Sequence, residues 1–152
     1  MPRSITLLAL GAVLLAGCGG GDKPSPRADL LKQADRICLN SGMRPRAIPG
    51  GLAQAAADLS GEARLRSAVR AKLAALRPPS DLRVDYARFL AASEGVAGDM
   101  RRMAGLARRG RQADFAELDR RTNLAEAARF RLAERIGFRR CGRPIQAPVR
   151  GG

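Results

Sequence analysis

A long, regularly spaced row of side chains is the feature of this sequence that most restricts its fold. Between positions 82 and 107, apolar or small residues recur at alternating steps of four and three: Leu82, Tyr86, Phe89, Ser93, Val96, Met100, Met103 and Ala107. This spacing places them on one face of an α-helix that packs along its length against other helices. Strand signals are absent, because β-branched residues are sparse and nothing alternates with a period of two. The sequence therefore predicts an all-α protein.

Local start and stop signals predict two helices before this one. The first is expected from Pro26 to Asn40, with Ser25 as its N-cap. The second covers Leu52–Leu76, either unbroken or interrupted at Ser60–Gly61. Pro78–Pro79 would stop it, because proline lacks the amide hydrogen and disfavours helix at the preceding residue.

Similar signals place the later boundaries. Ser80 is expected to cap the third helix, and Gly110 to end it in the left-handed conformation. The fourth helix is predicted to begin at Asp114, where Glu117 completes a capping box, and to end at Gly137. Its expected inner face is Phe115, Leu118, Ala125, Ala128, Leu132 and Ile136. The predicted fold is an up-and-down bundle of about four helices.

The N-terminus reads as a bacterial lipoprotein signal peptide. Arg3 is followed by the apolar run Ile5–Leu15, which is too short for a membrane span. Leu15-Ala16-Gly17-Cys18 then matches a lipobox. The alternatives are an ordinary secretory signal with a chance cysteine, or a buried apolar helix. We expect cleavage after residue 17 and a diacylglyceryl group on the Cys18 thiol.

This interpretation divides the chain into four parts: signal peptide 1–17, lipidated tether 18–27, helical bundle 28–141 and a disordered basic tail 142–152. The tether has no apolar pattern and is rich in glycine. The mature protein is then expected on the extracytoplasmic face of the cell membrane, anchored there by its acyl chains.

Two cysteines remain once Cys18 carries lipid. An even pair in an exported domain suggests a disulfide between Cys38 and Cys141, which would close nearly the whole bundle. A redox pair or a two-thiolate metal site is the alternative. The chain has no C-x-x-C motif, no histidine and no obvious third ligand.

Composition excludes several function classes. The chain has no His, which removes Ser-His-Asp and Cys-His catalysis and imidazole metal sites. Four Phe and one Tyr are too few for a base-stacking nucleic-acid platform, although the net charge is +14. Arginine outnumbers lysine 25 to 3. Ala, Gly, Arg and Pro, which all have GC-rich codons, make up 79 of the 152 residues, so we attribute part of the basic excess to coding bias.

The densest basic segment could contact anionic lipid headgroups or acidic wall polymers. Its members are Arg101, Arg102, Arg108, Arg109 and Arg111. The alternative, favoured by the coding bias, is a solvated helix face on which Arg108 and Arg109 complement a helix C-terminus.

No metal site or cofactor is predicted. Met100 and Met103 lie on the core row without a third ligand, so packing explains them better than soft-metal binding. The carboxylates, Glu126 among them, are scattered and are interpreted as solvated partners of arginine. A di-metal site would need paired interior carboxylates with histidines, which the chain lacks.

Several short motifs occur together over almost the whole mature chain. They are the lipobox, Ala34–Cys38 (ADRIC), Leu76–Pro79 (LRPP), Tyr86 and Phe89, the turn Gly110–Asp114 and Gly137–Cys141 (GFRRC). In this layout the chain resembles small envelope lipoproteins of high-GC actinobacteria. The resemblance best supports the pairing of the two late cysteines and implies little about mechanism.

These observations favour a non-enzymatic envelope lipoprotein that acts as a binding or interaction module. The membrane is a predicted partner, through the lipid on Cys18, and an anionic lipid or wall polymer is a further candidate. Nucleic acid is not expected, and the sequence identifies no protein partner. The alternative is a small-ligand or lipid-binding protein, with its pocket between the third and fourth helices near Tyr86, Phe89 and Met100. An enzyme that uses carboxylates alone is a third option, for which no constellation is found.

Overall fold

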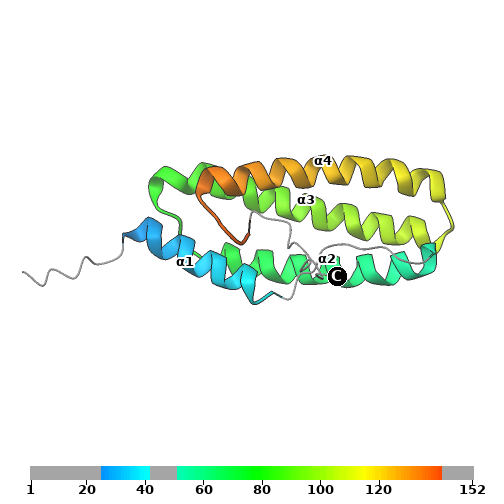
Figure 1. Cartoon of the computed structure of the whole chain (residues 1–152), viewed down its shortest axis with the longest axis horizontal. Helices are drawn as coiled ribbons and strands as arrows, with labels where there is room; N and C mark the ends of the chain where they lie inside the picture. Colours follow the sequence, from blue (N-terminus) through cyan, green and yellow to red (C-terminus); the bar gives the residue numbers. More distant parts are fainter. Residues whose placement is uncertain (1–24, 42–50, 142–152) are drawn as a thin grey trace, which may run out of the picture.

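The computed structural model describes residues 25–41 and 51–141, which fold into a bundle of four α-helices (Figure 1). The elements are α1 (Pro26–Leu39), α2 (Leu52–Ala74), the short 3-10 helix η1 (Ser80–Leu82), α3 (Arg83–Arg108) and α4 (Gln112–Ile136). Successive α-helices run in opposite directions, and the described part of the chain contains no strand. The predicted all-α, up-and-down architecture is confirmed.

Three of the expected helix ends are confirmed. The Ser25 hydroxyl accepts a hydrogen bond from the Ala28 N–H at 3.2 Å and so caps α1. Gly110, which follows α3, and Gly137, which follows α4, have φ angles of +67° and +103°. Only glycine adopts this left-handed region without strain. After Gly137, the Phe138 N–H returns to the Ala133 carbonyl at 2.9 Å, which closes the end of α4.

Other expected boundaries are wrong. Ser80 does not cap α3 but opens η1, since the Leu82 N–H bonds to the Pro79 carbonyl at 3.0 Å. α4 begins two residues before Asp114, and no side-chain cap forms at Arg111. The Asp114 carboxylate forms an ion pair with Arg111 instead.

No break occurs in the middle of α2. The helix continues through Ser60–Gly61, where the Ser60 hydroxyl donates to the Ala56 carbonyl at 2.7 Å. A serine that bonds back to its own helix in this way satisfies its hydroxyl without interrupting the backbone ladder. α2 therefore spans the length of the bundle as one rod.

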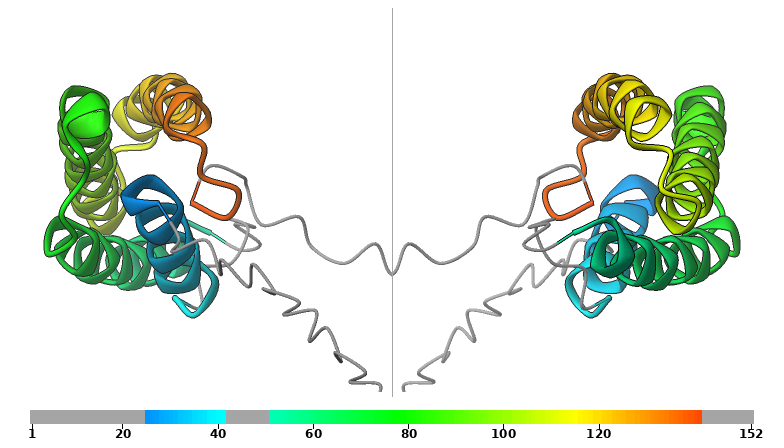
Figure 2. Two further views of the ribbon diagram at one scale, coloured as in Figure 1. Left: turned by 90° about the vertical axis from the view of Figure 1, so that its left-hand side faces the viewer. Right: turned by 90° about the vertical axis from the view of Figure 1, so that its right-hand side faces the viewer.

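The helices pack unequally. α3 lies between α2 and α4 and contacts both along its length, whereas α1 makes far fewer contacts, mainly with α2. Figure 2 looks along the helices and shows that the segment after α4 turns back toward α1. This return segment, Gly137–Cys141, holds α1 against the bundle.

The apolar interior consists of two clusters. One lies at the end of the bundle that holds α1; its buried members are Leu30, Ala34, Cys38, Val69, Leu73, Leu82, Tyr86, Phe89, Ala133, Ile136, Phe138 and Cys141. The other lies toward the α3–α4 turn and contains Leu59, Ala63, Val96, Met100, Met103 and Ala104. The α3 row predicted from sequence supplies both clusters, and its one polar member, Ser93, is only half-buried between them.

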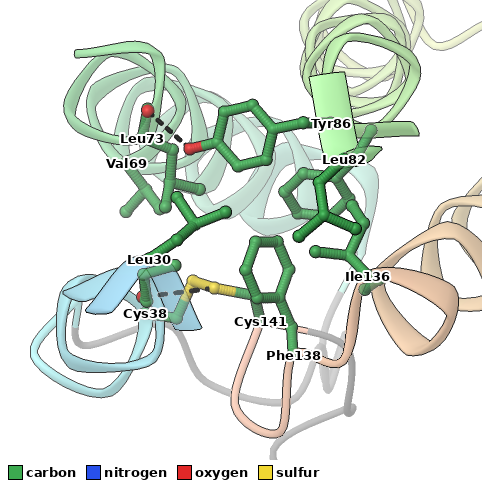
Figure 3. Close-up of a cluster of buried hydrophobic side chains, with 12 residues drawn as sticks. Leu30, Cys38, Val69, Leu73, Leu82, Tyr86, Ile136, Phe138 and Cys141 are labelled. Carbon is green, nitrogen blue, oxygen red and sulfur yellow. Dashed lines mark hydrogen bonds between the residues drawn. A yellow bond between two sulfur atoms is a disulfide. The ribbon is translucent and has the colours of Figure 1, made fainter. Parts of the chain in front are cut away.

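Tyr86 anchors the first cluster to the end of α2. Its hydroxyl donates to the Leu73 carbonyl at 2.6 Å, and its ring meets Phe138 edge to face at 6.1 Å between centroids (Figure 3). Leu73 lies in the last turn of α2, and its carbonyl also accepts the Leu76 N–H at 2.9 Å. The phenol therefore adds a second hydrogen bond, from inside the core, to a carbonyl at the end of α2.

The phenol of Tyr86 should ionise at a higher pH in the folded protein than in the unfolded chain. Burial raises the pKa of its phenol from 10.0 to about 12. Because the folded pKa is the higher one, this contribution to stability is complete below pH 10 and is lost as the pH rises toward 12. Since Tyr86 is the only Tyr and the chain has no Trp, ultraviolet absorbance reports tyrosinate directly. We expect a midpoint near pH 12 in buffer and near pH 10 in concentrated urea. A midpoint near 10 in both would show that the phenol is solvated.

Within residues 25–41 and 51–141, no helix combines the length and the apolar character needed to cross a bilayer.

Candidate functional site

The two late cysteines are bonded to each other. Cys38 at the end of α1 and Cys141 after α4 form a disulfide with 5.2 Å between their Cα atoms, and both residues are buried (Figure 3). The bond closes a loop that contains α2, α3 and α4. The predicted disulfide is therefore confirmed.

Asp35 forms a second link between α1 and the return segment. Its carboxylate accepts backbone N–H bonds from Arg139 at 3.0 Å, from Arg140 at 2.7 Å and from Cys141 at 3.4 Å. One carboxylate thereby accepts hydrogen bonds from three successive backbone N–H groups. Hydrogen bonds to a charged acceptor are stronger than those between neutral groups. The interaction fixes the position of Cys141 relative to α1.

A layer of charged residues separates the two apolar clusters. Along α2, Arg66 lies between Ala63 of one cluster and Val69 of the other. Along α4, Glu126 and Arg129 lie between the helical turn that contains Thr122 and the one that contains Ala133. We call Glu62, Arg66, Glu126 and Arg129 the polar layer. Their side chains expose only 10–17 % of their surface.

Ion pairs connect the polar layer across the bundle. Arg66 binds Glu62 on its own helix at 2.8 Å and Glu126 on α4 at 2.9 Å. Arg129 also binds Glu126, with 3.0 Å between its Nη2 and the Glu126 Oε1. Glu126 therefore accepts hydrogen bonds from two guanidinium groups, one on α2 and one on α4. This geometry sets the register of α2 against α4.

Arg129 also connects the polar layer to the disulfide. Its Nη1 donates to the Cys141 carbonyl at 3.1 Å. Its guanidinium carbon lies 4.6 Å from the Phe130 ring centroid and 5.6 Å from that of Phe89, both within the range of cation–π attraction. Arg129 is 8 % exposed, and it joins the return segment, α3 and α4 at one point.

The ionisation of Glu126 reflects these contacts. Burial acts to raise its pKa, but the hydrogen bonds and charges of Arg129 and Arg66 outweigh burial and lower the pKa below 4.5. For Arg66, burial acts to lower the pKa, and Glu126 and Glu62 reverse this effect and raise it. Glu126 and Arg66 are therefore both charged at neutral pH.

A small cavity borders the polar layer. All four helices contribute to its lining, which includes Cys38, Arg66, Arg70, Phe89, Ser93 and Arg129. Its volume is about 20 Å³. Arg70 Nε is buried and has no hydrogen-bond partner in the described part of the chain. An unsatisfied buried donor costs about 1–3 kcal/mol, so the feature is an unusual one.

The predicted basic segment consists largely of paired residues. Arg101 binds Glu94 at 2.8 Å and donates to Ser67, while Arg102 and Arg111 form ion pairs with Asp99 and Asp114. For the two other arginines, the described residues supply no carboxylate. Arg108 donates to the Ser60 hydroxyl at 3.2 Å, and the guanidinium of Arg109 lies over Gly105. Contact between these five side chains and anionic surfaces stays a prediction.

The residues of the predicted ligand pocket belong to the core. Tyr86 and Phe89 are buried in the first cluster, and Met100 is buried in the second. Phe89 also borders the small cavity between the clusters. Binding of a ligand between α3 and α4 stays a prediction.

The lipidation residue, Cys18, lies outside the described residues, and so do positions 19–24 of the tether and the whole tail. The last three tether positions, 25–27, are the N-cap and the first residues of α1. Within the described ranges, no group of three His, Cys, Asp or Glu side chains could hold a metal ion.

Sequence reasoning missed the polar layer. Glu126 was interpreted as solvated; it is paired with arginine as expected, but its side chain is only 17 % exposed. One signal could have revealed it. Arg129 stands four residues after Ala125 and four before Ala133, so it occupies an inward position of α4. Because arginine is so abundant in this chain, an individual arginine is easily assigned to the surface.

Comparison with models of known protein families, with curated proteins and with solved structures gave no significant match to this chain.

Proposed function

We propose that this protein is a lipid-anchored, extracytoplasmic binding module of a bacterial envelope. The observation that carries the proposal is the position of Cys18, directly after a short apolar run and within a lipobox. A diacylglyceryl thioether there would hold the helical domain at the outer face of the cell membrane, because each buried CH2 group contributes about 0.8 kcal/mol.

The disulfide supports an oxidising location. Structural disulfides are typical of proteins outside the cytoplasm and rare inside it. Cys38 and Cys141 are buried and join the two ends of the bundle, as a structural bond does. An exported domain with such a bond agrees with the lipobox.

Binding is proposed in place of catalysis because of the side chains that are available. The chain has no histidine, and its most buried charged group, the polar layer, consists of arginines and glutamates already paired with each other. Paired groups of this kind hold helices together and leave no free general base. A domain of this construction can present a surface or a small site to a partner.

The anchor can be tested by comparing Cys18→Ser with the wild type in the native envelope. The wild type should incorporate labelled fatty acid and sediment with membranes; Cys18→Ser should lose the label completely and leave the membrane fraction. The matched control is Cys38→Ala/Cys141→Ala, which keeps Cys18 and should keep the label. Equal labelling of Cys18→Ser and wild type would overturn the proposal.

The binding role can be tested with the same pair of proteins. Crosslinking in the native envelope, followed by purification, should recover a specific component with the wild type that is depleted with Cys18→Ser. Saturable turnover of a wall-derived substrate by the purified protein would show instead that the protein is an enzyme.

A further inference from the structure

The small cavity between the two apolar clusters has an unusual lining for its position. Three arginines, Arg66, Arg70 and Arg129, border it together with Ser93 and apolar side chains. Its volume of about 20 Å³ exceeds the 10–15 Å³ or so that one water molecule requires. The inner space therefore accommodates one water-sized particle.

The charges around the cavity do not balance. Arg66 is bound by Glu62 and Glu126, and Arg129 is bound by Glu126 and the Cys141 carbonyl. These four side chains sum to zero. Arg70 adds a third guanidinium for which the described residues supply no carboxylate, and its buried Nε–H has no acceptor. Arg70 as a whole is half-buried, so the site carries one unpaired positive charge at its rim and one unused buried donor.

We propose that this cavity binds a single monovalent anion of the size of chloride, with Arg70 Nε as its principal donor. Such an ion supplies both missing elements, since it accepts the N–H hydrogen bond and neutralises the excess charge. A water molecule would satisfy the donor but would bring no negative charge to the unpaired guanidinium. Apolar walls from Val69, Leu73 and Phe89 limit hydration and strengthen the attraction.

The location gives the anion a structural consequence. The cavity touches Cys38 of α1, Arg70 of α2, Phe89 of α3 and Arg129 of α4. An ion that binds the folded protein and not the unfolded chain stabilises the fold in proportion to its occupancy. The bundle is then expected to sense halide concentration whether or not it is anchored to a membrane.

The proposal is tested by thermal unfolding of the mature chain in detergent, in sodium chloride and in sodium gluconate of equal ionic strength. At tenfold the dissociation constant, chloride should raise the unfolding temperature of the wild type by about 3–6 °C relative to the Arg70→Gln variant. The matched control is Arg64→Gln, which removes an exposed arginine of the same helix and should behave as the wild type. General salt effects cancel in this comparison.

A second measurement covers the case in which Arg70→Gln fails to fold. Wild-type crystals soaked in sodium bromide should show an anomalous scattering peak at hydrogen-bond distance from Arg70 Nε. A chloride effect of equal size in wild type and Arg70→Gln would overturn the proposal. So would the absence of a bromide peak in the cavity, which would assign the space to water.

Discussion

Replacement of both bonded cysteines, as Cys38→Ala/Cys141→Ala, is expected to lower the free energy of unfolding by about 4–5 kcal/mol. The disulfide joins residues 103 positions apart, so it restricts almost the whole unfolded domain. In the chain-entropy account a loop of about 100 residues contributes roughly 4.7 kcal/mol. Since α1 has few other contacts, its backbone should also be the first to lose protection from hydrogen exchange.

Urea unfolding followed by circular dichroism measures this difference. A reducing agent should destabilise the wild type by a similar amount and leave the double variant unchanged, which provides the control. A loss below about 1 kcal/mol would mean that Asp35 and the apolar contacts hold α1 without the covalent bond.

The second large effect is expected from Arg129→Met. Removal of one partner of a buried ion pair leaves the other charge uncompensated, which costs about 3–5 kcal/mol. Glu126 keeps Arg66 as a partner, so we expect the lower limit, about 3 kcal/mol. The variant also loses the bond to the Cys141 carbonyl, which weakens the attachment of the return segment.

Arg131→Met is the matched control, because Arg131 is exposed on the same helix and its loss should change stability by less than about 0.5 kcal/mol. The combination Glu126→Gln/Arg129→Met removes both charges and should cost less than the sum of the two single changes. Strict additivity of the two would contradict direct coupling.

The same pair has a pH signature. Because the folded pKa of Glu126 is lowered, its contribution to stability is present above the ordinary value of 4.5 and is lost as the pH falls through the folded pKa. The stability difference between wild type and Glu126→Gln should therefore shrink below pH 4.5 and stay constant near neutrality.

The sequence predicted the fold because its strongest signals are local and repeated. The α3 row needs only side-chain spacing, and it was buried as expected at every apolar position. Ser25 and Gly137 were also correct, since each end is set by one residue and its neighbours. The disulfide followed from the even number of cysteines that remains after Cys18.

The errors arose where two local signals compete. Ser80 can cap a helix, but the Pro79 carbonyl instead closes a tighter turn with the Leu82 N–H. Asp114 can also act as a cap, yet its carboxylate is taken by Arg111, and the Phe115 N–H bonds to the Arg111 carbonyl at 2.9 Å. The sequence shows that each cap and each competing interaction can form, but it does not give the free-energy difference between them.

The polar layer could not be predicted for a different reason. Arg66 and Glu126 are 60 positions apart, and their pairing depends on the register of α2 against α4. With 25 arginines in the chain, the inward position on α4 is a local signal for Arg129 alone, and no local signal indicates that Arg66 pairs with Glu126. Three-dimensional packing determines that pairing, and it also creates the cavity beside Arg70.

Mass spectrometry of the intact protein, purified from native membranes, tests the central claim most directly. The account predicts the mass of residues 18–152 plus an acyl-bearing glyceryl group, less two hydrogen atoms for the disulfide, and a gain of those two on reduction. A mass that includes residues 1–17, or an unmodified Cys18, would contradict the lipid anchor. A mass unchanged by reduction would contradict the closed bundle.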